Sequence, residues 1–82
     1  MKELEQDQRE KIISVLADLA DVSADKITED TKLKDGLGMD SLDIVEAVMK
    51  LEEEFDCSIP DEDYEFAKTV GDVFKIVANR IN

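Results

Sequence analysis

The chain of 82 residues is predicted to fold as an all-α bundle of three main helices and one short helix. Three observations indicate this. Apolar residues recur with the helical period in three segments, no segment alternates apolar and polar residues as a half-buried strand does, and Pro60 leaves room for only a short helix before the last segment. Because so short a chain buries only one small core, residues 1–82 are expected to form a single domain.

The first helix is expected over residues 4–20. Four apolar residues there share one helical face: Ile12, Val15, Leu16 and Leu19. Residues 21–39 then form a connection that is long for a compact domain, and such loops are often functional. The alternative is a plain crossover between two helices. Four apolar residues are expected to attach this loop to the core: Val22, Ile27, Leu33 and Leu37.

The second helix is expected over residues 41–55 and has the clearest pattern. Asp40 suits the N-cap, and Asp43 lies where it can complete a capping box. Five apolar residues form one stripe that is expected to face the core: Ile44, Ala47, Val48, Leu51 and Phe55.

After Pro60, the segment from Asp61 to about Ala67 is expected to form a short helix or a single turn, with Tyr64 and Phe66 as its large side chains. Thr69 is expected to cap the last helix, with help from Asp72. The apolar stripe of that last helix consists of five residues: Val70, Val73, Phe74, Val77 and Ile81.

The formal charge of −12 bears on the choice of partners. It argues against nucleic acid and against stable association with anionic membranes, because both require the opposite sign. It favours partner proteins with basic patches, which electrostatic steering brings together quickly. The alternative is that the charge only keeps the protein soluble. So charged a small domain is expected to be a monomer.

The chain has no histidine and one cysteine, Cys57. A histidine-based triad, a Cys/His zinc site and an intrachain disulfide are therefore excluded, and Cys57 is expected to be a small, partly buried residue. The acidic clusters lack the pattern of a calcium loop, so no metal site is predicted. Without a membrane-length apolar run or a signal-peptide pattern, we expect a cytoplasmic protein.

Ser41 lies in the first turn of the second predicted helix. A helix N-terminus presents unpaired N–H groups and partial positive charge, so a phosphate ester there is stabilised. Gly36 and Gly38 are expected to leave the approach open, and Asp40 supplies the cap, which frees the serine hydroxyl. Serine is also common at this position for capping alone. Because the chain offers no base, Ser41 is interpreted as the substrate of a modifying enzyme, not as a nucleophile.

The same helix carries a second apolar stripe, formed by Leu42, Val45 and Met49. It is centred roughly 130° from the core stripe, at 100° per residue, and it lies beside Glu46 and Glu53. An apolar strip bordered by carboxylates suggests a docking face for a partner. The alternative is that the long loop covers it.

The stretch from Gly36 to Asp63 resembles the acyl carrier proteins of type II, or dissociated, fatty acid synthesis. The Asp-Ser-Leu sequence at 40–42 matches the attachment site of that family. Leu-Glu-Glu-Glu-Phe-Asp at 51–56, Ile-Pro-Asp-Glu at 59–62 and Thr-Val at 69–70 match its further motifs. The resemblance implies a four-helix bundle and a phosphopantetheine arm esterified to Ser41, whose thiol carries acyl chains as thioesters.

The resemblance also implies two sets of binding residues and a set of partners. The expected docking residues are Asp40, Leu42, Asp43, Val45, Glu46, Met49, Glu52 and Glu53. The expected acyl-pocket residues are Ile44, Ala47, Val48, Leu51, Phe55, Ile59, Ala67 and Val73. The implied partners are a phosphopantetheinyl transferase, ketoacyl synthases, acyl and malonyl transferases, a ketoacyl reductase, a dehydratase and an enoyl reductase.

Three residues of the short helix depart from the family pattern. Ala67 replaces a bulky aliphatic residue, Phe66 occupies a position that is normally polar, and Tyr64 replaces a small residue. These departures affect the expected packing of the short helix and the shape of the pocket, but not the arm.

The leading hypothesis is a carrier, not an enzyme, that presents one tethered thioester to successive active sites at high effective concentration. A carrier of polyketide or other specialised acyl groups is the alternative within this class. An unmodified acidic interaction module is the alternative outside it, and a hydrolase using Ser41 lacks the necessary base.

Overall fold

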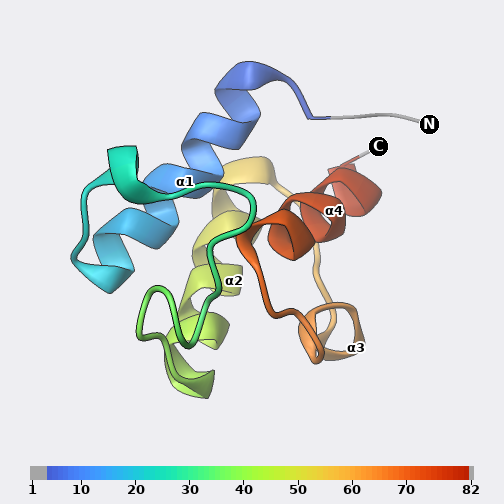
Figure 1. Cartoon of the computed structure of the whole chain (residues 1–82). Helices are drawn as coiled ribbons and strands as arrows, with labels where there is room; N and C mark the ends of the chain where they lie inside the picture. The colour runs from blue at the N-terminus through green and yellow to red at the C-terminus, as the bar shows by residue number, and fades with distance from the viewer. Residues whose placement is uncertain (1–3, 82) are drawn as a thin grey trace.

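The computed structural model describes residues 4–81, and within them it contains four α-helices and no strand. These are α1 (Gln6–Ala20), α2 (Ser41–Phe55), α3 (Asp61–Tyr64) and α4 (Val70–Ile81). In Figure 1, α1 (blue), α2 (green to yellow) and α4 (red) form the body of the bundle, and α3 (orange) lies at its edge beside α4. The predicted fold class, three main helices and one short helix, is confirmed.

The core is a single apolar cluster to which α1, α2, α4 and the loops contribute. Its most completely buried side chains are Ile12, Leu16, Leu33, Leu51, Val70 and Val77. The stripes predicted from the helical period supply most of it. Among the described residues, no polar or charged residue is buried, so the side chains of the interior interact by apolar packing.

The start of α1 is two residues later than predicted. Leu4 is buried against the core, and its carbonyl oxygen accepts a hydrogen bond of 2.7 Å from Arg9 Nη1. The Glu5 amide donates to Gln8 Oε1 at 2.8 Å and so defines the first turn from Gln6 onward. A tertiary contact of Leu4 therefore sets this boundary, which the helical period could not locate.

The loop between α1 and α2 is held against the start of α4. Hydrogen bonds run from the Leu33 amide to the Lys68 carbonyl (2.8 Å) and from the Val70 amide to the Thr31 carbonyl (2.9 Å). Ile27, Leu33 and Leu37 are buried, as predicted, while Val22 is half-buried. A short 3-10 helix, Ala24–Lys26, was not predicted. Because both these hydrogen bonds and the buried apolar side chains fix the loop, it places the first turn of α2 in a defined position.

Helix α3 is a single turn, one of the two forms expected for the segment from Asp61 to about Ala67, and it covers only the first part of that segment. It ends at Tyr64, because Lys68 further along this segment forms hydrogen bonds outside the helix. The Lys68 carbonyl accepts from Leu33, and the Lys68 amide donates to Asp72 Oδ2 at 2.8 Å. None of the four residues of α3 is buried, so this helix is the least firmly packed of the four α-helices.

The predicted cap of α4 is confirmed. The Asp72 amide donates to Thr69 Oγ1 at 3.2 Å, and Asp72 Oδ2 accepts from the Thr69 amide at 3.1 Å as well as from Lys68. The hydrogen bond from the Lys68 amide is the main cause that lowers the pKa of Asp72, and it outweighs the opposing effect of burial.

Asp72→Asn should therefore reduce stability in a pH-dependent way. The pKa of Asp72 is lower in the folded state than the unfolded value of about 3.9. The stabilisation is thus present above that unfolded value and is lost as the pH falls through the folded one. Near pH 7, we expect the free energy of unfolding measured in urea to be about 1 kcal/mol higher for the native chain than for the variant. This difference should vanish in acid.

Asp18→Asn is the matched control, because Asp18 is exposed in the last turn of α1 and forms no cap. A difference between the native chain and Asp72→Asn that stayed constant from neutral to acid pH would contradict the assigned role of the Asp72 carboxylate.

Candidate functional site

Ser41 is the first residue of α2, and its side chain is exposed. The residue before it, Asp40, is the N-cap and accepts a hydrogen bond of 2.9 Å on Oδ1 from the Asp43 amide. Asp43 reciprocates, since its Oδ2 accepts from the Asp40 amide at 3.2 Å. The predicted capping box is confirmed, and it is complete without the Ser41 hydroxyl.

The start of α2 has the electrostatic character that a phosphate ester requires. The first amides of a helix have no intrahelical acceptor, so those of Ser41 and Leu42 carry the partial positive charge of the helix end. The carboxylates of Asp40 and Asp43 oppose this charge, and they are exposed or half-buried, where water screens them. A phosphate ester on Ser41 Oγ therefore fits the amides at this helix start.

The two glycines of the loop have different roles. Gly38 has a left-handed φ of 68°, and a Cβ placed on it would meet no atom within 4 Å. It leaves open space before Ser41, as predicted. A Cβ on Gly36 would lie 2.5 Å from the Lys32 carbonyl oxygen, so this glycine is needed for the tight turn. The expectation that Gly36 keeps the approach open is corrected accordingly.

One exposed face of α2 combines apolar and acidic side chains. Leu42 is 68% exposed and Met49 is 56% exposed, whereas Val45 is half-buried. Glu46 and Glu53 are exposed and share this face by helical spacing. The loop leaves both large apolar residues uncovered, so the interpretation that it covers the stripe is wrong. We call Leu42, Glu46, Met49 and Glu53 the acidic-apolar face.

The other acidic residues expected to dock have structural contacts of their own. Asp40 and Asp43 form the capping box. Glu52 is half-buried, and its Oε2 accepts a hydrogen bond of 2.8 Å from the Ile59 amide. This contact ties the segment after α2 back onto the helix. No sequence motif indicated it, because it joins residues that only the fold brings together.

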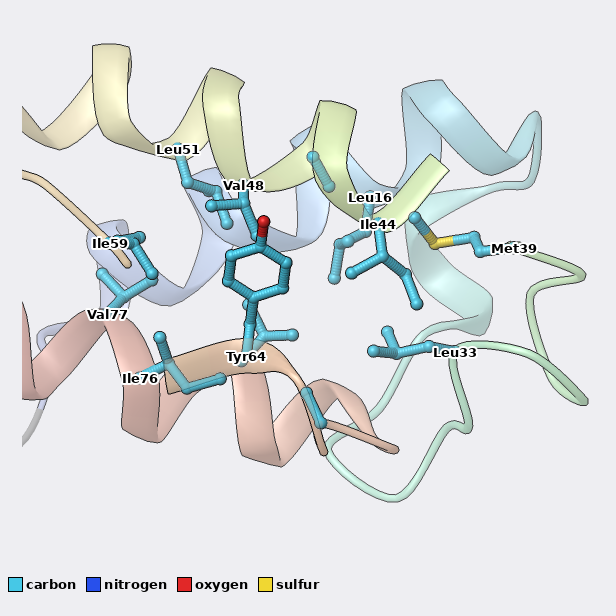
Figure 2. Close-up of a pocket in the computed structure, with 13 residues that line it drawn as sticks. Leu16, Leu33, Met39, Ile44, Val48, Leu51, Ile59, Tyr64, Ile76 and Val77 are labelled. Atoms are coloured by element: carbon cyan, nitrogen blue, oxygen red, sulfur yellow. The ribbon is translucent and has the colours of Figure 1, made fainter. Parts of the chain in front are cut away.

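An apolar cavity lies between α1, α2, α4 and residues 61–67, which we call the α3 segment, and it has a volume of about 20 Å³ (Figure 2). Seven residues predicted for the pocket line it: Ile44, Ala47, Val48, Leu51, Ile59, Ala67 and Val73. Phe55, the eighth, does not. It is the last residue of α2, about 6 Å beyond Leu51 along the helix axis at 1.5 Å per residue, and it packs half-buried against the core instead.

Six further residues line the cavity that were not named for it from the sequence: Leu16, Leu33, Met39, Tyr64, Ile76 and Val77. One of them had a local signal. Met39 directly precedes the N-cap Asp40, and Ile44 lies at the fourth helical position, which is the spacing of a hydrophobic staple. Both line the cavity. The others come from distant segments, so only the fold shows that they meet.

Cys57 is half-buried after the end of α2, in agreement with the sequence-based expectation. Burial is the main cause that raises the pKa of its thiol, and the carboxylates of Glu52 and Asp56 raise it further. The thiol is therefore protonated at neutral pH and is a poor nucleophile.

Two kinds of feature are absent from residues 4–81. No group of three or more His, Cys, Asp or Glu side chains is arranged to hold a metal ion. No helix there has the length and apolar character that crossing a membrane requires.

The fold and the exposed serine at the start of α2 define a small helical domain suited to covalent modification. Comparison with known protein families agrees. The family described as the phosphopantetheine attachment site matches residues 10–77, which covers α2, α3 and most of α1 and α4. The chain belongs to this family of carrier domains, and its prosthetic group is covalently attached phosphopantetheine.

Proposed function

We propose that this chain is an acyl carrier protein of type II fatty acid synthesis, with the phosphopantetheine arm esterified to Ser41. The observation that carries the proposal is the exposed Ser41 hydroxyl at the start of α2, which Asp40 and Asp43 leave out of the cap. The open space beside Gly38 gives a transferase access to it. The protein acts as a carrier and not as an enzyme, in keeping with its family.

The bound group supplies a thiol that holds acyl chains as thioesters. The chain's own residues have three tasks. Ser41 anchors the phosphate beside the first amides of α2. The acidic-apolar face, together with the other predicted docking residues, presents the arm to basic surfaces. The cavity shelters the apolar part of the acyl chain, so that it is not exposed to water.

The proposed partners act in sequence on the same arm in the cytoplasm. They are the phosphopantetheinyl transferase, the acyl and malonyl transferases, the ketoacyl synthases, the ketoacyl reductase, the dehydratase and the enoyl reductase. A monomer suits this role, because each partner must reach the acidic-apolar face in turn.

The apolar lining of the cavity favours fatty acyl chains over polyketides. The thirteen lining residues are all apolar apart from Tyr64, and its hydroxyl donates to Asp61 Oδ1 at 3.0 Å. The keto groups of a polyketide would lose their hydrogen bonds to water in such a cavity, at a cost of about 1–3 kcal/mol each. A saturated chain has no such penalty.

Reconstituted synthesis tests the proposal. The chain carrying phosphopantetheine is supplied with malonyl transferase and the enzymes of type II fatty acid synthesis, or with a polyketide ketosynthase. The proposal predicts elongation to saturated acyl groups by the first set. Malonyl loading without such elongation, but with extension by the polyketide enzyme, would support the polyketide alternative instead.

Glu46→Lys should weaken the use of the chain by its partner enzymes. The substitution reverses an exposed charge in the middle of the acidic-apolar face, so it opposes the steering toward a basic partner. We expect kcat/KM for malonyl transferase to fall about tenfold at low ionic strength and less at high salt. Asp18→Lys, with the same charge change on an exposed position of α1, is the control. Equal losses in both variants would contradict a localised docking face.

A further inference from the structure

The cavity is very small in this structure. Its volume of about 20 Å³ is little more than the roughly 10–15 Å³ that one water molecule requires. An acyl chain of several carbons therefore enters only if some of the lining side chains move. The lining side chain that has to move therefore determines how many carbons of the acyl group the cavity admits.

Most of the lining residues are fixed by the core. Leu16 and Leu51 are each 1% exposed, and Val77 is completely buried. They belong to α1, α2 and α4, of which α1 packs against both of the others. Because protein interiors are packed as densely as organic crystals, these side chains yield little without disturbing the bundle.

Four lining residues are only half-buried, namely Ile44, Tyr64, Ala67 and Ile76, and Tyr64 has the largest side chain of the four. It belongs to α3, which has no buried residue and packs on α4, and its own side chain is only half-buried. Figure 2 shows its ring rising from α3 across the cavity toward α2. An ion pair between Asp63 and Arg80 links α3 to α4, so the ring can move while the helix stays attached.

The surroundings of the Tyr64 hydroxyl permit such movement. The hydroxyl donates to Asp61 Oδ1 at an exposed edge, where water can replace this partner when the ring turns. The ring itself lies among apolar side chains. Burial and the hydrogen bond to Asp61 raise the pKa of Tyr64, so the phenol stays neutral and compatible with an apolar cavity.

The neighbours of Tyr64 contribute no comparable obstruction. Ala67, the other cavity residue of this segment, has only a methyl group. Phe66 is 79% exposed and is not among the residues that line the cavity. Tyr64 is thus the one large side chain that the α3 segment places in the cavity.

We propose that Tyr64 limits the length of the acyl chain that the cavity shelters, an inference that rests on the proposed carrier function. The ring occupies space that the distal carbons of a longer chain would need. Replacing it with a small side chain should extend the sheltered length, and retaining the ring without its hydroxyl should not.

Thermal unfolding of chains loaded with acyl groups tests this inference. A broad-specificity phosphopantetheinyl transferase loads the chain from a series of saturated acyl-coenzyme A thioesters, butyryl to palmitoyl. Because a group that binds only the folded state stabilises it, the midpoint should rise with acyl length until the cavity is full. Each midpoint is compared with that of the same variant carrying phosphopantetheine alone.

In Tyr64→Ala the unfolding midpoint should keep rising for acyl groups about four to six carbons longer than in the native chain. The reason is that removal of the ring leaves a space about as large as the ring. Tyr64→Phe should keep the native limit. Phe66→Ala removes an aromatic ring outside the cavity and should also keep it. Tyr64→Leu, with an intermediate limit expected, serves if Tyr64→Ala does not fold.

The same limit in the native chain, Tyr64→Ala and Tyr64→Leu would overturn the role of Tyr64 and leave the carrier function standing, because loading itself demonstrates that function. An unfolding midpoint that does not depend on acyl length in any variant would also overturn the role of Tyr64. Failure of the folded native chain to accept any acyl-phosphopantetheine would instead overturn the carrier function.

Discussion

Replacing Ser41 with alanine should abolish carrier activity and leave the fold intact. The Ser41 hydroxyl is the proposed attachment atom, and alanine offers no oxygen to esterify. The side chain is exposed, and the cap of α2 is made by Asp40 and Asp43. The free energy of unfolding of Ser41→Ala should therefore lie within about 0.5 kcal/mol of the native value. Malonyl loading by malonyl transferase, after treatment with coenzyme A and a phosphopantetheinyl transferase, should be undetectable.

Ser58→Ala is the matched control, since Ser58 is also an exposed serine but lies after α2. It should be loaded at the native rate. Native loading of Ser41→Ala would contradict the attachment site. A partner-binding activity that survived in Ser41→Ala would favour the acidic interaction module instead.

Leu51→Ala should produce a large loss of stability. Leu51 is 1% exposed and lines the cavity, so the substitution removes buried apolar surface and enlarges an existing void. We expect a loss of about 2–5 kcal/mol in urea unfolding, out of a total of about 5–15 kcal/mol for a typical domain. In a domain this small, the loss should leave a substantial unfolded population at physiological temperature.

Leu42→Ala is the control on the same helix, because Leu42 is 68% exposed. Its stability should lie within about 0.5 kcal/mol of the native chain, although its use by partner enzymes should decline. Similar stability losses in the two variants would show that the core and exposed faces of α2 are assigned wrongly.

The elements predicted best from the sequence are those whose limits are set by local interactions. Asp40 and Asp43 can form a capping box only at the start of α2, so they predict where this helix begins. Thr69 and Asp72 predict the start of α4 in the same way. The exposure of Leu42 also followed from a local rule, the angle between two stripes on one helix.

The features that were missed depend on contacts between distant segments. The end of α3 is set by the hydrogen bonds of Lys68 with Leu33 and Asp72, which no local pattern indicates. The need for glycine at position 36 comes from the close approach of the Lys32 carbonyl. Tyr64 departs from the family pattern, but its place in the cavity depends on the packing of α3 against α4, which the sequence does not show.

The most direct test of Ser41 as the carrier's attachment residue is the site of phosphopantetheine attachment, determined by mass spectrometry. The folded, unmodified chain is incubated with coenzyme A, magnesium and a broad-specificity phosphopantetheinyl transferase, and its intact mass and peptide fragments are then measured. We expect a gain of one phosphopantetheine, located on Ser41. No gain, or a gain on another residue, would contradict it.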